Sequence, residues 1–377
     1  MACRYHADHV GSLLRPQELL DARKDPQRTR EQVTAIEDRH ILGVLKRQKD
    51  AGLEIFTDGE LRRTSFMSDF YESVDGLNQE YEVARVWNGA PAGVGAAKGI
   101  GAPGAAVVAK LRQTKRLTKH EVDFLKRHAP GDIKMTLPTA NQFPAIAYKK
   151  GVSERAYPTY SEFLWDIVPI MKAEIQALVN DGIKYIQIDA PRYSYYIDPK
   201  WRRHIQEEMG VDPDVALDEA IRVDNACLEG ITRDGVILAM HLCRGNNRSQ
   251  WYAEGGYDPI AERLFNQLNV DVFLLEYESE RAGTFDALRF VPRTKSVVLG
   301  LVSSKIPQLE LQNDLIHRIE EASRYVPLEN LAISPQCGFA STLEGNLLSE
   351  QDQWRKLELV VDTARQVWKD ALFGRTR

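Results

Sequence analysis

The chain has 377 residues, of which 43% are hydrophobic and 27% charged, and its formal net charge is -5. This composition is typical of a globular protein with a substantial core, and the length fits either one large α/β barrel or two ordinary domains. The negative charge balance argues against a nucleic-acid or anionic membrane partner, because phosphate groups attract a surplus of Lys and Arg.

The first residues contain no apolar segment of the kind found in secretion signals, and no later apolar run is long enough to cross a bilayer. We therefore expect a cytoplasmic protein. The chain has four cysteines, too few for a disulfide framework at this length. In a reducing compartment these thiols are available for a metal or for chemistry.

Short apolar runs typical of buried parallel strands alternate with helical patterns along the whole chain. The predicted strands are 8–12, 53–57, 133–137, 184–189, 236–241, 271–276, 296–301 and 331–334. The predicted helices are 31–51, near the N-terminus, and then 117–128, 161–181, 213–229, 258–268, 283–289, 307–323 and 351–370. Eight such units predict a (β/α)₈ TIM barrel, and we expect residues 1–377 to form a single domain.

Residues 75–116 are long for a connection and rich in Gly, Ala and Pro. We expect an inserted flap or hairpin over the mouth of the barrel. A phosphate-binding loop is the alternative, but no helical pattern opens directly after these glycines and no Gly-Lys-Ser/Thr follows them.

The strand at 236–241 ends in a metal-binding pattern, His241-x-Cys243. Residues two apart in a strand point to the same side, so both side chains can bind one ion. Glu276 and Cys337 each follow another apolar run, and strand ends of a barrel meet at its active-site face. The sequence therefore predicts a zinc site of His241, Cys243, Glu276 and Cys337, with Glu278 as the alternative to Glu276.

These four ligands are dispersed along the chain, whereas structural zinc sites use closely spaced pairs, so a catalytic site is favoured. Two thiolates and a carboxylate already offset the charge of the ion. Such a site is suited to binding a substrate thiol and lowering its pKa, more than to making hydroxide.

A second group of polar residues is predicted at the same mouth. Asp58, Glu60 and Asp189 close two strands, and carboxylates there can hold an ammonium group. Ser12 closes the first predicted strand and can bind a carboxylate or cap a helix. The alternative for the three acids is scaffold ion pairing with Arg62, Arg63, Arg192 or Arg244.

Aromatic residues cluster after Asp189, where they can wall a pocket or pack a long loop. They are Tyr193, Tyr195, Tyr196 and Trp201.

These motifs resemble the catalytic half of cobalamin-independent methionine synthase and its short stand-alone relatives. The resemblance rests on His9-Val10-Gly11-Ser12, Asp58-Gly59-Glu60, Gln187-Ile188-Asp189, His241-x-Cys243, Glu276 and Pro335-Gln336-Cys337-Gly338. It implies a (β/α)₈ barrel in which zinc binds the sulfur of homocysteine, whose thiolate then attacks a methyl group. It also implies that Ser12, Glu60 and Asp189 hold the amino-acid end of homocysteine.

Two positions depart from the family pattern. Val302 stands where folate-using members carry a His that protonates the leaving nitrogen, so folate as the methyl donor is disfavoured. Arg192 and Tyr193 follow Asp189 where the family pattern continues with another acid, and both are candidate substrate-binding residues.

The sequence therefore predicts a zinc-dependent enzyme that transfers a methyl group to a small thiol, with homocysteine as the first candidate. A second hypothesis is alkylation of another thiol, such as coenzyme M by an epoxide, with Arg192 and Arg244 binding the sulfonate. A third is a non-catalytic binding protein in which zinc only braces the barrel.

Overall fold

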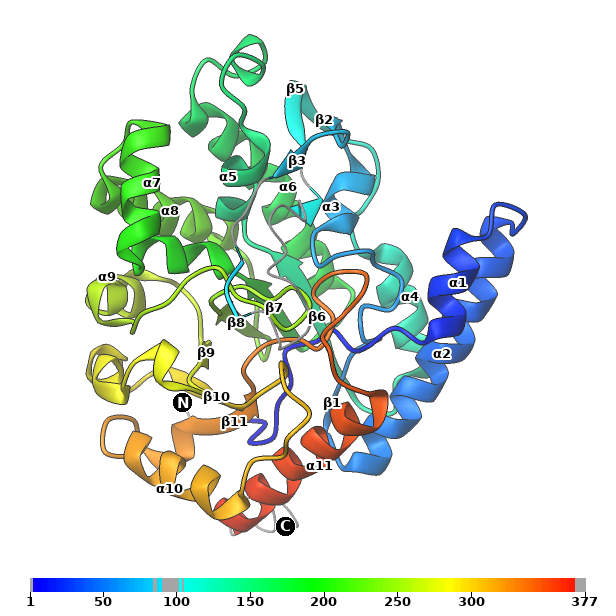
Figure 1. The fold of residues 1–377 in the computed structure, drawn as a ribbon, viewed down its shortest axis with the longest axis vertical. Helices are drawn as coiled ribbons and strands as arrows, with labels where there is room; N and C mark the ends of the chain where they lie inside the picture. Colours follow the sequence, from blue (N-terminus) through cyan, green and yellow to red (C-terminus); the bar gives the residue numbers. More distant parts are fainter. Residues whose placement is uncertain (1–2, 84–86, 90–101, 104, 370–377) are drawn as a thin grey trace.

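The computed structural model describes residues 3–83, 87–89, 102–103 and 105–369. Its centre is a parallel sheet of seven strands in the order β1-β6-β7-β8-β9-β10-β11, which curls on itself (Figure 1). The strands are β1 (Ile55–Phe56), β6 (Asp132–Pro138), β7 (Tyr185–Asp189), β8 (Ile237–Leu242), β9 (Val272–Glu276), β10 (Ser296–Val302) and β11 (Leu331–Pro335).

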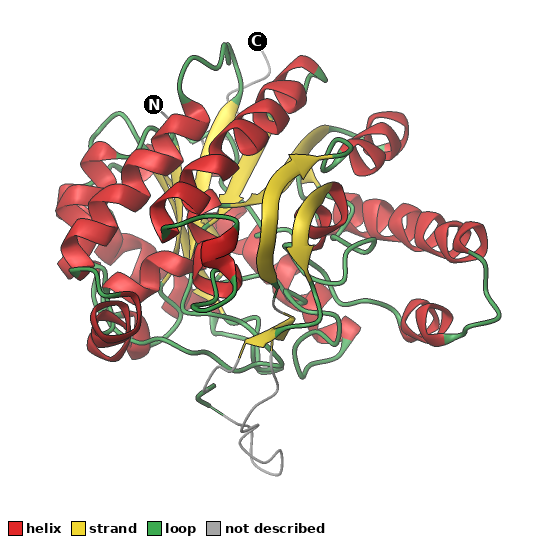
Figure 2. Ribbon diagram, turned by 90° about the horizontal axis from the view of Figure 1, so that it is seen from above, coloured by secondary structure: helices red, strands yellow, loops and turns green. Residues whose placement is uncertain are grey.

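Helices stand around this sheet (Figure 2). They are α1 (Gln17–Lys24), α2 (Arg30–Ala51), α3 (Ser68–Ser73), α4 (Lys119–His128), α5 (Pro144–Ala147), α6 (Tyr160–Asn180), α7 (Pro199–Met209), α8 (Pro213–Leu228), α9 (Asp258–Gln267), α10 (Gln312–Ala322) and α11 (Glu350–Val367). The predicted alternation of parallel strands and helices is thus confirmed for seven strands. No helix in the described part of the chain combines the length and apolarity needed to cross a membrane.

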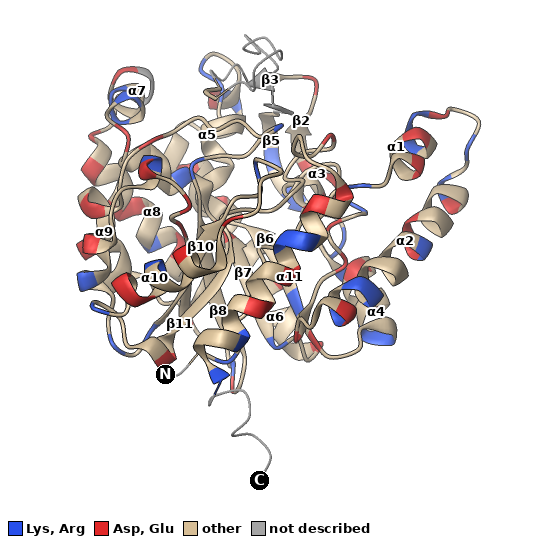
Figure 3. Ribbon diagram, turned by 60° about the horizontal axis from the view of Figure 1, so that its bottom comes forward, with Lys and Arg blue, Asp and Glu red and all other residues tan. Residues whose placement is uncertain are grey.

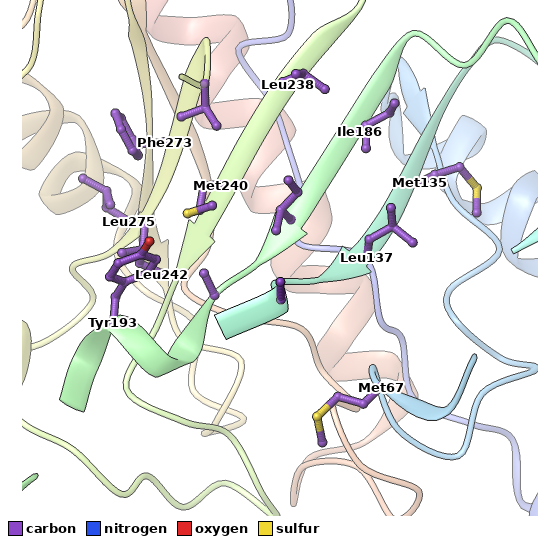
Figure 4. Close-up of a cluster of buried hydrophobic side chains, with 14 of the residues drawn as sticks. Met67, Met135, Leu137, Ile186, Tyr193, Leu238, Met240, Leu242, Phe273 and Leu275 are labelled. Carbon is purple, nitrogen blue, oxygen red and sulfur yellow. The ribbon is translucent and has the colours of Figure 1, made fainter. Parts of the chain in front are cut away.

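Side chains alternate between the two faces of the sheet. Leu238, Met240 and Leu242 of β8 belong to the apolar layer under the helices, together with neighbours on β6, β7 and β9 (Figure 4). Ala239 belongs to a second, smaller apolar cluster formed by the opposite side chains of the strands. Because the period of a strand is two, His241 shares the concave side with Ala239.

The first predicted strand, 8–12, is not a regular strand, and this prediction was wrong. The residue just before this segment, Ala7, makes one parallel bridge, to Ile333 in β11. On its other side Thr57 donates a hydrogen bond to the Gly11 carbonyl (3.1 Å). Gly11 has φ +138°, which interrupts an extended ladder. The segment therefore lies beside β11 and close to β1 without a continuous set of strand hydrogen bonds.

Two predicted helices also differ from the structure. The range 283–289 contains a 3₁₀ helix, Phe285–Phe290, in place of an α-helix. The range 307–323 becomes helical only at Gln312. Before that point Glu310 accepts bonds from the Ser303 amide and the Lys356 ammonium, which hold the chain in a loop.

The predicted insertion, 75–116, contains two antiparallel strand pairs outside the main sheet. They are β2 (Val74–Asn78) with β5 (Ala106–Gln113), and β3 (Glu82–Val83) with β4 (Ala102–Pro103). Most of its Gly-rich part, and with it the alternative of a phosphate-binding loop, lies outside the described residues.

Charged residues lie mostly on the outer helices and loops, and the central strands have few of them (Figure 3). Lys134 on β6 is an exception. Its fully buried ammonium donates hydrogen bonds to Asp8 (2.6 Å), the His9 carbonyl (2.7 Å) and Gln187 (2.9 Å). A lysine from the sheet thus holds the irregular N-terminal segment in place.

Replacing Lys134 by Ala should lower the free energy of unfolding by about 3–5 kcal/mol, because Asp8 would be left as a buried, unpaired charge. Lys119→Ala removes a solvent-exposed pair with Asp123 and is the matched control, with an expected loss below about 1 kcal/mol. Urea unfolding followed by circular dichroism measures both. Equal losses in the two variants would contradict the importance of this buried pair.

Candidate metal centre and substrate cavity

Three predicted ligands meet at the carboxyl ends of the strands. His241 is the second-last residue of β8, Cys243 follows that strand directly, and Cys337 comes two residues after β11. Their ligand atoms all lie within 4.8 Å of one another, and all three side chains are buried. The structure therefore brings together side chains that are almost a hundred positions apart in the chain.

The donor set fits a zinc ion. Both ring nitrogens of His241 are buried without a hydrogen-bond partner of normal geometry. Zinc bonds of about 2.0–2.3 Å to nitrogen and sulfur place tetrahedral ligands roughly 3.5 Å apart, so this cluster needs only a small contraction. Two thiols and an imidazole are also the donor types that zinc prefers over magnesium or calcium.

The two cysteines interact closely even without an ion. The neighbouring Cys243 thiol and the His241 imidazole hold the pKa of the Cys337 thiol well below its usual range, against the opposing effect of burial. Burial by itself would lower the pKa of His241, but Cys337 and the carboxylates of Asp189 and Glu276 raise that pKa overall. The cluster is thus prepared to carry a thiolate.

The fourth predicted ligand, Glu276, is buried nearby but does not belong to this close group. Its carboxylate accepts hydrogen bonds from the Arg281 guanidinium and the Arg244 amide, both at 2.8 Å. Glu278, the alternative, also pairs with Arg281. Burial and the charge of Glu276 raise the pKa of Glu278 to about 7. Whether Glu276 binds the ion stays a prediction.

A cavity opens beside the metal cluster, and two of the predicted carboxylates line it, Glu60 and Asp189. One Glu60 oxygen accepts a bond from Thr136 (2.8 Å), and the other is buried without a partner. Asp189 accepts from Gln187 (2.8 Å), and burial, reinforced by Glu60, raises its pKa to about 7. A cation bound in the cavity would stabilise the ionised form of both carboxyl groups.

Asp58 has a different position. It is absent from the described lining, and its carboxylate accepts a bond from the Glu60 amide (2.8 Å). This bond shapes a turn in which Glu60 has φ +55°, an uncommon conformation for a residue other than glycine. Asp58 thus orients Glu60. The alternative of scaffold pairing with Arg63 is weak for Glu60, whose oxygen lies 3.8 Å from that guanidinium, while Glu121 lies at 2.6 Å.

Ser12 also lines the cavity, next to the loop that carries Cys337. Its hydroxyl accepts a hydrogen bond from the Ala340 amide (3.4 Å). A Cβ atom on Gly338 would lie 1.9 Å from this hydroxyl, so glycine is needed for the close approach.

The structure places Arg192 and Tyr193 away from the described lining of the cavity. Arg192 stacks over the Tyr195 ring at 3.6 Å. Tyr193 donates its hydroxyl proton to Asp224 (2.8 Å). Arg244 is likewise directed to the Gly255 carbonyl (2.6 Å). The predicted substrate contacts of Arg192 and Tyr193 stay predictions, and so does the sulfonate hypothesis that rests on Arg192 and Arg244.

Other residues of the cavity were not singled out from the sequence. An apolar wall of the cavity is formed by Phe66, Met67, Trp87 and Tyr252. Asn246 adds a polar group to the lining. Trp87 belongs to the insertion, where no periodic pattern marks which side chain points inward. Of the predicted aromatic cluster, Tyr195 and Trp201 pack against Tyr252 from behind. Val302 is buried in β10 and is not part of the lining.

A buried lysine joins the two loops that carry the cysteines. The Lys305 ammonium donates hydrogen bonds to the Gly245 carbonyl (3.0 Å) and to Asn246 (2.8 Å). Asn246 in turn donates to the Gly338 carbonyl (2.8 Å), next to Cys337. This chain of bonds fixes the spacing of Cys243 and Cys337.

Comparison with known proteins places this chain and its fold in one class. Residues 153–366 match the model of the cobalamin-independent synthase catalytic domain. The YxjH protein of Bacillus subtilis is 36% identical over 371 residues, covering 97% of this chain and 95% of that protein. A methionine synthase of Pyrococcus horikoshii is 25% identical, covering 95% and 89% respectively.

Solved structures agree with this result. A Listeria monocytogenes protein assigned as a vitamin-B12 independent methionine synthase has a TM-score of 0.74 at 28% identity, covering 98% of this chain and 99% of that one. A B12-independent methionine synthase from Shewanella, in complex with selenomethionine, has a TM-score of 0.75 at 19% identity over 98% and 99%, and this likeness concerns the fold alone. The chain belongs to the cobalamin-independent methionine synthase family. The methionine synthases among its members support an enzyme that transfers methyl groups.

If His241, Cys243 and Cys337 bind the ion, cysteine variants inside and outside this group should differ in zinc content. Cys243→Ser and Cys337→Ser should each lose stoichiometric zinc after dialysis, because a hydroxyl is a far weaker zinc ligand than a thiolate. Cys227→Ser changes a buried cysteine of α8 that is outside the cluster and should keep its zinc. Elemental analysis of the purified variants measures the difference. Full zinc occupancy in Cys337→Ser would show that the ion is held elsewhere.

Proposed function

We propose that the protein is a zinc-dependent S-methyltransferase that converts homocysteine to methionine. The observation that carries this proposal is the convergence of two groups on one cavity. The three sulfur and nitrogen donors meet at one side, and the buried carboxylates Glu60 and Asp189 line the same space. A thiol and an ammonium group on one small molecule match these two groups.

His241, Cys243 and Cys337 would hold the zinc ion, with Glu276 as the fourth ligand. Zinc bound there supplies a lowered pKa for a substrate thiol, so that a nucleophilic thiolate exists at neutral pH. For Glu276 to take part, its carboxylate has to give up or share the hydrogen bond from Arg281.

The carboxylates supply recognition of the amino-acid end. The free oxygen of Glu60 is a buried acceptor without a partner, which is unfavourable until a donor fills the position. The ammonium group of homocysteine is such a donor, and Asp189 gives it a second charged acceptor. Ser12 supports binding of the substrate carboxylate through its hydroxyl.

The apolar side of the cavity excludes water from the reacting sulfur. Phe66, Met67, Trp87 and Tyr252 line it. A thiolate is a stronger nucleophile when it is not surrounded by water, and the methyl carbon has to approach it along this wall.

Homocysteine should change the spectrum of the cobalt-substituted protein, because its sulfur adds a thiolate charge-transfer band. Homoserine, which carries oxygen in place of the sulfur, is the matched control and should leave the spectrum unchanged. No spectral response to homocysteine would contradict the proposed function, whatever the methyl donor is.

Glu60→Gln and Asp189→Asn should raise the KM for homocysteine roughly 10- to 100-fold, since each removes a charge-assisted bond worth about 1.5–3 kcal/mol. Both variants should keep stoichiometric zinc. Asp123→Asn, at an exposed position of α4, is the control and should leave KM unchanged. Steady-state kinetics with mass detection of methionine gives the values. An unchanged KM in both cavity variants would remove the assigned role of these carboxylates.

A further inference from the structure

The cavity beside the metal cluster is negative in character. Its described lining contains Glu60, Asp189 and two cysteines, and within these described residues it has no lysine or arginine. Two described basic side chains near the cavity form hydrogen bonds or ion pairs with other groups of the protein. Lys305 donates to the Gly245 carbonyl and Asn246, and Arg281 pairs with Glu276 and Glu278.

An aromatic wall stands directly next to the sulfur donors. The Tyr252 ring packs so closely on Gly245 that a Cβ there would lie 2.2 Å from a ring carbon, and Gly245 is two residues from Cys243. Trp87 meets Tyr252 edge to face, with ring centroids 5.5 Å apart and planes at 70°. Both rings line the same cavity as the sulfur donors, so a group bound beside the sulfur can contact them.

This wall supplies no proton to a leaving group. The Tyr252 hydroxyl already donates a hydrogen bond to the Pro191 carbonyl (3.0 Å). Phe66 and Met67 have no acidic proton, and the indole N–H of Trp87 is not an acid at neutral pH. Glu60 and Asp189 are occupied by the substrate ammonium in the proposed function. Within the described part of this wall, a methyl donor whose leaving group departs without protonation is therefore the best match.

We propose that the methyl donor is a small methyl-onium cation, a sulfonium or a quaternary ammonium. This inference rests on the proposed function. The homocysteine thiol releases its proton to solvent, and its thiolate attacks the methyl carbon of the donor. A carbon–sulfur bond forms while the bond from carbon to the onium atom breaks, and its electron pair stays on that atom. The products are methionine and a neutral thioether or tertiary amine.

Two physical effects favour such a donor. Aromatic faces attract a methyl-onium cation with about 0.5–2 kcal/mol, more when water is excluded. The substrate ammonium offsets only one of the two lining carboxylates, so the remaining negative charge adds Coulomb attraction for a cation. A donor with several carboxylates or phosphates would meet no Lys or Arg in the described lining.

The first experiment compares donors on the zinc-loaded protein with homocysteine. S-methylmethionine represents the sulfoniums, betaine the quaternary ammoniums, and 5-methyltetrahydrofolate the anionic donors. Each carries a deuterated methyl group, and labelled methionine is measured by mass spectrometry. We expect at least tenfold faster labelling from an onium donor than from the folate, and the two onium arms identify its class. Labelling from the folate alone would overturn the inference and leave the proposed function standing.

The second experiment tests recognition without turnover. Calorimetry on the homocysteine-loaded protein compares tetramethylammonium with tert-butanol, a neutral molecule of similar shape. We expect the cation to bind at least tenfold more tightly. Trp87→Leu should reduce this preference roughly 2- to 30-fold, whereas Trp165→Leu, a partly exposed tryptophan of α6, should not change it.

The cobalt spectrum of Trp87→Leu with homocysteine shows that the variant keeps its thiol site. Equal affinity for the cation and the alcohol, or no effect of Trp87→Leu, would overturn the inference. If homocysteine fails to change the cobalt spectrum of the unmodified protein, the proposed function itself fails and the inference fails with it.

Discussion

The alternation of side chains along β8 is the constraint on which the site depends. Leu238, Met240 and Leu242 are buried under the helices. Because side chains alternate along a strand, the His241 side chain lies on the opposite, concave side of the sheet. Cys243 follows at the carboxyl end of the strand. A shift of β8 by one residue would bury the imidazole among leucines and expose apolar side chains in the cavity. The packing that stabilises the sheet therefore also determines the direction of the His241 and Cys243 side chains.

The second requirement is a fixed distance between loops that are far apart in sequence. Cys243 follows β8 and Cys337 follows β11, so their separation is set by two intervening strands. The bonds from Lys305 through Asn246 to the Gly338 carbonyl connect these loops directly. A buried ion pair likewise holds the N-terminal segment in place, because the Lys134 ammonium binds the Asp8 carboxylate. Polar contacts thus order the segments that the strand ladder does not hold.

Much of this arrangement could be predicted from the sequence. Apolar runs of strand length, each followed by a helical period, indicated the parallel sheet, and His241-x-Cys243 at a strand end indicated a cluster of side chains that can bind a metal. Glu60 and Asp189, which line the cavity, were found because each lies at or just after the end of a strand. These successes share one cause, since strand period and strand ends are local properties.

The failures have equally specific causes. The segment 8–12 has the composition of a strand, but Gly11 adopts a positive φ that no pattern reveals. The direction of the Arg192 side chain was also not predictable: the 3₁₀ helix Pro191–Tyr196 turns it onto Tyr195, and its substrate contact stays a prediction. Trp87 reaches the cavity from an insertion without periodicity. In each case the position depends on tertiary contacts that a short stretch of sequence does not encode.

The claim that a substrate thiol joins the metal donors is tested most directly by X-ray absorption at the zinc edge, with and without homocysteine. The account predicts two sulfur ligands in the zinc-loaded protein and three after homocysteine is added, with the histidine nitrogen retained. A sulfur count that stays at two, in a protein shown to have bound homocysteine, would contradict it.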